Sequence, residues 1–462
     1  MSDISLLVRN ALLITLAPGE DNAYCGWFTV DDLGRIIDVG HGDPPAGVAA
    51  DETLDAGGRF VAPGFISAHS HLSTSGSRGL GTDVPLYGWG DAMTTYTRHC
   101  DADDIYWVVM HGALDFLGNG ITTAYDFTAS RLAFAMVEGQ RVQFGELKGK
   151  DFAEAQFRAK IDGGIRFINS IHINDEIGSD EEIEARFLET LQHAENYPDS
   201  GQYLGTAISG SVQWSSTPET ARREVKLMRK YGVINQPHFL ETSEQLELQR
   251  SKFAWYEEAG ALGPDLIFGH FVHPTDEMIA TVARCGCAMC WQPTSNGRLA
   301  SGVADIPRFV KEGMRVGVGL DDQACTDISD PFQNMRMGIY IQRAHRRDAR
   351  AIGVAQMLRL HTMGSAEALG IADKVGSLEP GKFADFVVVD PRQPDTGPLW
   401  DPVATYVLAC GLRNLKAVYV GGRCVNREGV SLNPLAARAS AEMHARLGRI
   451  AEKIAAPALM PA

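Results

Sequence analysis

The sequence has little positive charge for its size. Its 462 residues include 42 lysines and arginines against 58 aspartates and glutamates, which gives a formal net charge of −16. Proteins bind a phosphate backbone through clustered lysines and arginines, and this binding releases counterions from the nucleic acid. The excess of acidic residues therefore argues against nucleic acid as a partner. Long hydrophobic runs are also missing. The apolar stretch at residues 11–17 is short and follows Asp3 and Arg9, which fits neither a signal peptide nor a membrane span. We expect a cytoplasmic protein without membrane contact.

Cysteine is sparse, with eight residues spread over the chain. A chain of this length can bury a core that needs no disulfide staples, so we expect reduced thiols. The cluster Cys285-Gly-Cys-Ala-Met-Cys290 could hold a metal, but no nearby histidine or further cysteine completes a four-ligand structural site. Buried small side chains on a strand are the favoured interpretation.

The middle of the sequence alternates short apolar runs with longer segments of helical period. This rhythm is typical of βα units around a parallel sheet. The segments 181–196, 218–231, 243–260 and 276–284 have the length and period of crossover helices. We therefore predict an α/β fold with a closed (β/α)₈ TIM barrel, and a doubly wound sheet is the alternative. Eight apolar runs are expected to be strands, and they end at His69, Asp126, Asn174, Ser209, His238, His270, Trp291 and Asp321.

The two ends of the chain have a different pattern. Residues 5–40 and 384–426 contain short strand-like runs separated by Gly-rich turns, which predicts one small β-sandwich domain formed from both termini. After Asn433 an alanine-rich, charged stretch predicts a helix that covers either the barrel or a partner subunit. The expected division is residues 1–61 and 373–430 for the β-domain, 62–372 for the barrel and 431–462 for the C-terminal helix.

Histidines and an aspartate occupy the ends of several predicted strands. His69 and His71 point to the same face because strand side chains alternate, so two imidazoles can hold one ion. An HxH pair alone is a weak signal, since a solvated or core pair gives the same pattern. His238, His270 and Asp321 each close a further apolar run. The carboxyl ends of barrel strands form the active-site rim, so these residues are expected to converge.

The order of these motifs resembles the amidohydrolase superfamily, specifically the mononuclear branch of aminoheterocycle deaminases and triazine and phenylurea hydrolases. The resemblance covers nearly the whole chain. It implies one divalent metal ion bound by His69, His71, His238 and Asp321, with zinc preferred and cobalt, manganese or iron as alternatives. The related binuclear enzymes use a lysine after strand four, and residues 203–214 contain none. The segments that carry the resemblance are Ala62-Pro-Gly-Phe-Ile-Ser-Ala-His-Ser-His-Leu72, His238-Phe-Leu-Glu241, Gly269-His270-Phe-Val-His273, Gln292-Pro-Thr-Ser-Asn296, Gly319-Leu-Asp321 and residues 376–390.

The resemblance also implies roles for three residues in hydrolysis by a metal-bound hydroxide. Asp321 would accept a proton from water, Glu241 would pass it to the leaving nitrogen, and His270 would orient the hydroxide or stabilise the oxyanion. Glu241 could instead only begin the helix that follows, and His273 competes with His270 for its role. Asp322 is expected to support the site without binding the ion.

The substrate is less constrained than the metal site. Trp89 in the Gly-rich loop after the first strand, together with Trp214, Phe271 and Asn296, predicts a pocket for a small apolar substrate. Deaminases of the branch carry a histidine just after strand four, where this chain has Ser211-Val-Gln-Trp-Ser-Ser216. This departure argues against a deaminase without excluding one. Around residues 69–126 the chain most resembles the phenylurea and molinate-type thiocarbamate hydrolases, which implies cleavage of a C–N bond at a urea or carbamoyl carbon.

Two other functions remain open at this point. Deamination or dehalogenation of an amino-substituted heterocycle, such as a triazine, purine or pyrimidine, would use the same site. A non-catalytic binding protein on the same barrel is the third hypothesis, although every expected ligand is present. We also expect a homo-oligomer, because relatives commonly self-associate through barrel helices.

Overall fold

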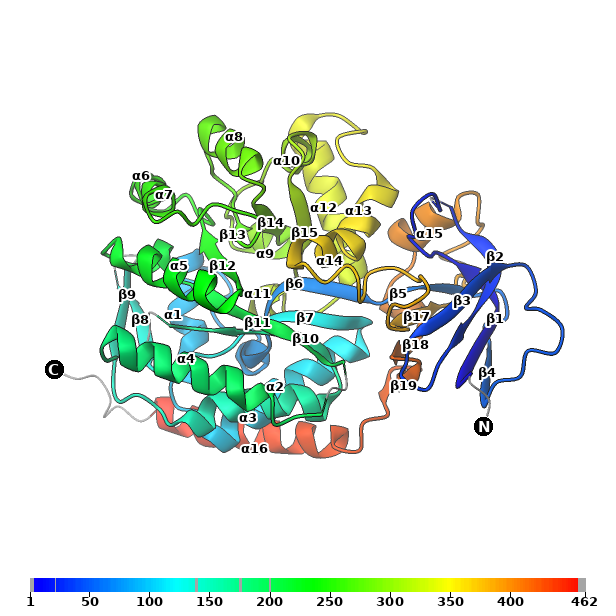
Figure 1. The fold of residues 1–462 in the computed structure, drawn as a ribbon, viewed down its shortest axis with the longest axis horizontal. Helices are drawn as coiled ribbons and strands as arrows, with labels where there is room; N and C mark the ends of the chain where they lie inside the picture. The colour runs from blue at the N-terminus through cyan, green and yellow to red at the C-terminus, as the bar shows by residue number, and fades with distance from the viewer. Residues whose placement is uncertain (1–3, 21, 138–139, 174–176, 199–200, 456–462) are drawn as a thin grey trace.

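The computed structural model describes residues 4–20, 22–137, 140–173, 177–198 and 201–455. They form a large barrel with a smaller β-domain beside it (Figure 1). None of the helices in these ranges has the length and apolar character needed to cross a membrane. Asn174, the expected end of the third barrel strand, lies outside the described residues.

The barrel is built from parallel strands in chain order, each hydrogen-bonded to the next. The eighth strand has two halves, β15 and β16, separated only by residues 319–320. β15 pairs with β14 and β16 pairs with β6, so the sheet closes on itself and the predicted TIM barrel is confirmed. The strands are β6 (Phe65–His71), β7 (Ile121–Phe127), β10 (Arg166–Ile171), β11 (Tyr203–Gly210), β12 (Ile234–Phe239), β13 (Ile267–His270), β14 (Ala288–Trp291), β15 (Arg315–Val318) and β16 (Asp321–Asp322).

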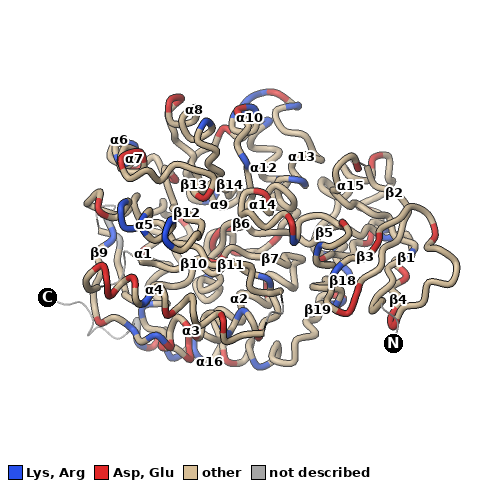
Figure 2. The backbone as a smooth tube through the Cα atoms, in the orientation of Figure 1, with Lys and Arg blue, Asp and Glu red and all other residues tan. Residues whose placement is uncertain are grey.

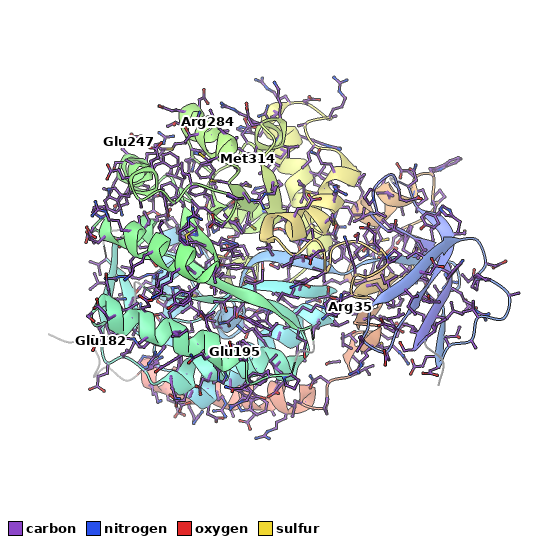
Figure 3. The ribbon with its side chains drawn as sticks, in the orientation of Figure 1. Arg35, Glu182, Glu195, Glu247, Arg284 and Met314 are labelled. Atoms are coloured by element: carbon purple, nitrogen blue, oxygen red, sulfur yellow. The ribbon has the colours of Figure 1, made fainter. Side chains whose placement is uncertain are left out.

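Helices surround the barrel, and charged residues of both signs are frequent along α3 (Lys150–Gly163), α4 (Asp180–Ala194) and α16 (Ala436–Ala455) (Figure 2). In α4, Ser179 Oγ accepts a hydrogen bond from the amide of Glu182, and the Glu182 side chain accepts one from the amide of Ser179, so the first turn is capped (Figure 3). The expected helix at 243–260 is divided at Lys252 into α6 (Leu246–Ser251) and α7 (Phe253–Glu258). The other helices that follow barrel strands are α2 (Ala102–Gly118), α3 (Lys150–Gly163), α4 (Asp180–Ala194), α5 (Glu219–Tyr231), α8 (Asp276–Arg284), α10 (Ile306–Lys311), α12 (Pro331–Arg346), α13 (Val354–Leu360) and α14 (Met363–Leu369).

Shorter elements lie in the loops at the carboxyl ends of the strands and in the β-domain. Those near the barrel rim are η1 (Leu72–Ser77), α1 (Leu86–Thr97), the hairpin of β8 (Ala133–Val137) and β9 (Gln140–Phe144), η2 (Val212–Trp214), α9 (Pro293–Arg298) and α11 (Gln323–Thr326). α15 (Pro402–Leu408) and η3 (Leu412–Asn414) connect strands of the β-domain. The C-terminal helix α16 (Ala436–Ala455) covers the barrel, because Arg446 pairs with Asp104 on α2.

The β-domain is one curled sheet of nine strands instead of two separate sheets. A bulge at residues 9–10 in β1 lets this strand pair with β4 along its first half and with β5 along its second. The sheet folds over its own apolar face, where Phe28 meets Phe386 edge to face at 5.2 Å between centroids. The strands are β1 (Leu6–Leu13), β2 (Tyr24–Val30), β3 (Ile36–His41), β4 (Glu52–Asp55), β5 (Phe60–Pro63), β17 (Phe386–Val389), β18 (Leu415–Val420), β19 (Arg423–Arg427) and β20 (Val430–Ser431).

A buried ion pair joins the two parts of the molecule. Arg166 on β10 donates to both carboxylate oxygens of Asp385, at 2.6 and 2.9 Å. The guanidinium also stacks on the ring of Phe383 at 3.6 Å from its centroid, and Asp385 accepts a hydrogen bond from the amide of Gly421. Both charged side chains are almost fully buried, so each charge is compensated by the other instead of by water.

The substitution Arg166→Met is expected to lower the free energy of unfolding by about 3–5 kcal/mol, because it leaves the Asp385 carboxylate buried without its cation. Denaturant unfolding followed by circular dichroism measures this. Arg9→Met is the control, since the Arg9–Asp55 pair within the β-domain is half exposed and contributes about 0–1 kcal/mol. Equal losses of unfolding free energy in the two variants would contradict the assignment of Arg166 and Asp385 as a buried pair whose charges depend on each other.

Candidate metal centre and substrate cavity

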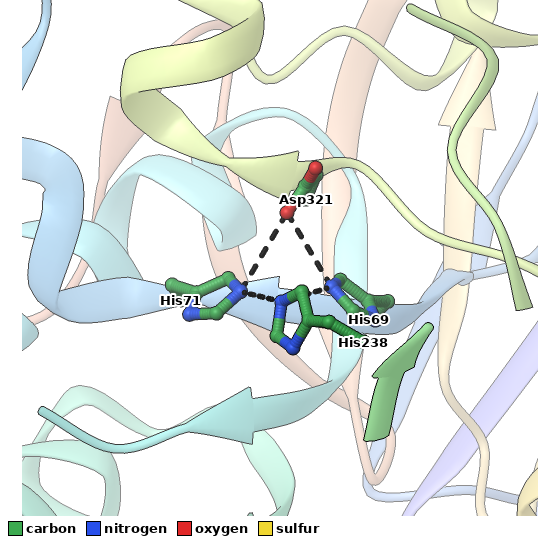
Figure 4. A group of neighbouring side chains, drawn as sticks. All are labelled: His69, His71, His238 and Asp321. Atoms are coloured by element: carbon green, nitrogen blue, oxygen red, sulfur yellow. Dashed lines mark hydrogen bonds and ion pairs between the residues drawn. The ribbon is translucent and has the colours of Figure 1, made fainter. Parts of the chain in front are cut away.

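Four side chains from three barrel strands meet at the carboxyl end of the barrel (Figure 4). His238 Nε2 lies 3.1 Å from Nε2 of both His69 and His71. Asp321 Oδ1 lies 3.4 Å from Nε2 of His69 and 3.6 Å from Nε2 of His71. The four predicted ligands are therefore brought together, with one donor atom of each facing a common point.

The donor set fits a divalent cation. Burial lowers the pKa of His71 and of His238 well below the ordinary value, so these imidazoles are neutral and offer lone pairs. Three imidazole nitrogens and one carboxylate oxygen are the donors that Zn²⁺ takes, and other divalent transition metals accept the same set.

The orientation of His69 is fixed by a second residue on β12. Gln236 accepts a hydrogen bond at Oε1 from His69 Nδ1, and its own Nε2 donates to the carbonyl of Ala68 at 3.0 Å. The proton of His69 is thus on Nδ1 and the lone pair of Nε2 points to the ligand cluster. Metal-bound histidines commonly have such a partner, which sets both tautomer and ring direction.

Glycines allow the neighbouring strands to approach His69 closely. A Cβ added at Gly319 would lie 2.6 Å from the carbonyl oxygen of His69 and 2.7 Å from its Cβ. A Cβ at Gly269 would lie 2.9 Å from Cε1 of the His69 ring. Real Cβ atoms are not found at such distances, so the space around His69 exists only because both positions lack a side chain.

Glu241 and His270 lie beside the ligand cluster. His270 Nε2 is 3.6 Å from Glu241 Oε2 and 3.8 Å from Asp321 Oδ2. Asn296 Nδ2 donates to His270 Nδ1 at 3.0 Å, which puts the proton of the neutral ring on Nε2, facing the two carboxyls. Burial and the charge of Asp321 raise the pKa of Glu241 well above its ordinary value, which favours the protonated form of this carboxyl.

The competing interpretations of these residues do not match the geometry. The helix after β12 begins at Leu246, so Glu241 is not in its first turn. His273 hydrogen-bonds the carbonyl of Ser301, away from the ligand cluster.

Asp322 lines the cavity, with Oδ2 3.7 Å from His71 Nε2. Cys290, in the cysteine cluster, is fully buried on β14 as expected.

An open cavity of about 980 Å³, which includes its mouth, lies above the ligand cluster. Two of the four predicted pocket residues, Trp89 and Trp214, line it. Phe271 instead lies in the core, where it stacks on Phe268 at 4.7 Å, and Asn296 is buried behind His270. The backbone of Phe271 has φ 44°, which turns its side chain away from the rim.

Several lining residues were not anticipated from the sequence. Phe127 stacks on His71 at 4.7 Å and Tyr87 contacts Trp214, so the walls of the cavity are largely aromatic. His172 follows β10 directly, so its position after an apolar run was a signal that could have identified it. Arg141, on the β8–β9 hairpin, gave no such signal.

Comparison with known proteins agrees with this geometry. The model of the amidohydrolase family matches residues 60–425. The chain belongs to the amidohydrolase family. A 5-methylthioadenosine/S-adenosylhomocysteine deaminase of Desulforudis audaxviator is 29% identical over 432 residues, covering 91% of this amidohydrolase and 93% of that protein. One of Syntrophobacter fumaroxidans is 28% identical over 437 residues, covering 92% and 93%.

A solved structure with the same fold is the adenosine deaminase of Xanthomonas campestris with bound zinc. It has a TM-score of 0.82 and 22% identity, and the match covers 97% of this amidohydrolase and 99% of that chain. The protein described here is thus a metal-dependent hydrolase that acts on carbon–nitrogen bonds other than peptide bonds. The preference for phenylurea and thiocarbamate hydrolases is not supported, because the relatives that it matches are named as deaminases.

Replacing Gln236 by leucine is expected to weaken zinc binding about 10- to 100-fold, because His69 loses the partner that holds its tautomer and direction. Competition with a chromophoric chelator measures the affinity. Gln342→Leu is the matched control, since Gln342 is also buried and donates only to the carbonyl of Ala304. Unchanged affinity in Gln236→Leu would show that His69 is held by other means.

Proposed function

We propose that this amidohydrolase removes an amino group from a purine-like heterocycle by hydrolysis, with zinc as the bound metal. The observation that carries the proposal is a buried carboxyl, Glu241, which lines a cavity with several aromatic residues, lies next to a His₃Asp cluster and has its pKa raised by burial. Relatives that match nearly the whole chain and are named as deaminases of adenine derivatives support the same reaction class.

Hydrolytic deamination needs proton transfers that these residues can perform. Water adds to the ring carbon that bears the amino group, a ring nitrogen takes a proton, and the C–N bond then breaks to release ammonia. A divalent ion held by the four ligands would supply Lewis acidity toward the water. Glu241 in its protonated form can give its proton to the ring nitrogen. Asp321 can accept one proton from water and return it to the departing amino group, which leaves as ammonia, and the second proton of the water restores Glu241. His270, with its proton on Nε2, can donate a hydrogen bond to the developing oxyanion.

The cavity walls favour a flat ring with a polar extension. Trp89, Phe127 and Trp214 offer aromatic surfaces on which a heterocycle can stack. Arg141 and Lys148 line the same cavity, so a negatively charged substituent on the substrate would be attracted there. An adenine-type base with an anionic side chain combines both features.

Cleavage at a urea or carbamoyl carbon is the second candidate. It is favoured by a single observation, namely that Trp214 and not a histidine follows β11 in residues 211–216. Such a substrate would use the same proton donor and leave an amine instead of ammonia. Dehalogenation of a triazine would release chloride.

The zinc-loaded enzyme is expected to release ammonia from aminopurine nucleosides, with higher kcat/KM for those that carry a carboxylate. The assay incubates it with adenosine, 5′-methylthioadenosine, S-adenosylhomocysteine, a triazine and a phenylurea, and identifies products by mass. An aniline from the phenylurea, with no ammonia from any purine, would support the second candidate and contradict the proposal.

The substitution Glu241→Gln is expected to lower kcat about 10²- to 10⁴-fold while zinc content stays at the wild-type level, because the amide cannot donate a proton to the ring nitrogen in the same way. Steady-state kinetics and metal analysis of the same preparation measure both quantities. Full activity in this variant would remove Glu241 from the reaction.

A further inference from the structure

Two aromatic side chains of the cavity wall come from different loops and meet each other. Tyr87 belongs to α1, which follows β6, and Trp214 belongs to η2, which follows β11. Their rings are edge to face with centroids 5.9 Å apart, and both line the cavity. The distance between the two rings therefore depends on how the two loops are held relative to each other.

Lys252, at the end of α6, holds the segment that carries Trp214. Its Nζ donates to the carbonyls of Gln213 and Ser215, both at 2.6 Å, and these two residues flank Trp214 in the chain. The side chain is only 3% exposed, and no carboxylate of the described residues pairs with it. Burial lowers the pKa of Lys252 to about 8. An ammonium buried without a counter-ion is costly, so the two carbonyls determine where it can lie.

Gln249, one turn earlier on the same helix, holds the other ring. Its Nε2 donates to the hydroxyl of Tyr87 at 3.0 Å and to the carbonyl of Glu244 at 2.6 Å. Gln249 is 2% exposed. One short helix therefore contacts both loops, and it follows β12, the strand that carries His238. Neither Lys252 nor Gln249 lines the cavity.

We propose that Lys252 and Gln249 are positioning residues that set the distance from the Tyr87–Trp214 pair to the ligand cluster and thereby select the size of ring that the cavity accepts. This inference rests on the proposed function for the identity of the ring. Because neither residue reaches the reacting atoms, their loss changes substrate binding more than the chemical step. A residue with a merely structural role would lower activity on all substrates alike.

The test compares Lys252→Met with wild type on a bicyclic aminopurine nucleoside and a monocyclic aminotriazine. The variant keeps the apolar stem and removes both hydrogen bonds. KM for the aminopurine is expected to rise about tenfold, with kcat changed by less than about threefold and the ratio of kcat/KM between the two substrates shifted. Lys311→Met is the matched control, because Lys311 also ends a six-residue helix but is exposed. Equal changes for both substrates would overturn the proposal.

A second pair of variants does not depend on how Lys252→Met folds. Gln249→Leu and Tyr87→Phe each remove one side of the same hydrogen bond, so the double variant is expected to have nearly the KM of either single variant. Additive effects would show that Gln249 does not act through Tyr87.

Hydrogen–deuterium exchange separates this inference from the proposed function. Amides of residues 214 and 215 are expected to exchange about tenfold faster in Lys252→Met than in wild type, whatever substrate the enzyme uses. Unchanged exchange overturns the inference even if aminopurines are deaminated. Faster exchange, together with a wild-type enzyme that deaminates no purine, overturns the proposed function and leaves the positioning role in place.

Discussion

The close approach of three barrel strands around His69 is the constraint on which the site depends. Gly269 and Gly319 leave room for its ring and backbone, and Gln236 fixes which nitrogen faces the cluster. The eighth strand is interrupted at residues 319–320, where it passes His69 and reaches β6. Asp321, with φ 64°, occupies a left-handed backbone conformation at this point, and such strain persists only where surrounding structure imposes it.

Burial gives the two carboxyls of the site different tasks. Asp321 faces three imidazoles and accepts a hydrogen bond from Ser295 Oγ at 2.5 Å, which favours its ionised form. Glu241 faces the charge of Asp321 in the same dry environment, which raises its pKa and favours its protonated form. One acceptor and one donor of protons thus lie beside the same nitrogen of His270, as hydrolysis with a nitrogen leaving group requires.

Much of this arrangement follows from local sequence rules. The period of two places His69 and His71 on one face, and the βα rhythm places His238, His270 and Asp321 at the same rim. The choice of the four ligands among these residues came from the resemblance to the amidohydrolase superfamily. The position of Phe271 could not be predicted in this way. The same rule predicts a residue at the rim, whereas the backbone of Phe271 turns its ring into the core.

Contacts between distant loops could not be predicted from local sequence rules either. Tyr87 and Arg141 reach the cavity from a helix and a hairpin whose paths depend on tertiary packing. The curled β-domain depends on a bulge at residues 9–10 that has no clear sequence signature. The preference for urea substrates relied on a resemblance around residues 69–126 and on one missing histidine, and both are weaker guides than the relatives of the whole chain.

The central claim is that four side chains hold one divalent ion at the carboxyl end of the barrel. A crystal structure of the zinc-loaded protein, with anomalous differences collected at the zinc edge, tests it most directly. The account predicts one strong peak per chain, about 2.0–2.2 Å from Nε2 of His69, His71 and His238 and from a carboxylate oxygen of Asp321. A protein that takes up zinc with its anomalous peak elsewhere, or with no ordered peak, would contradict the claim.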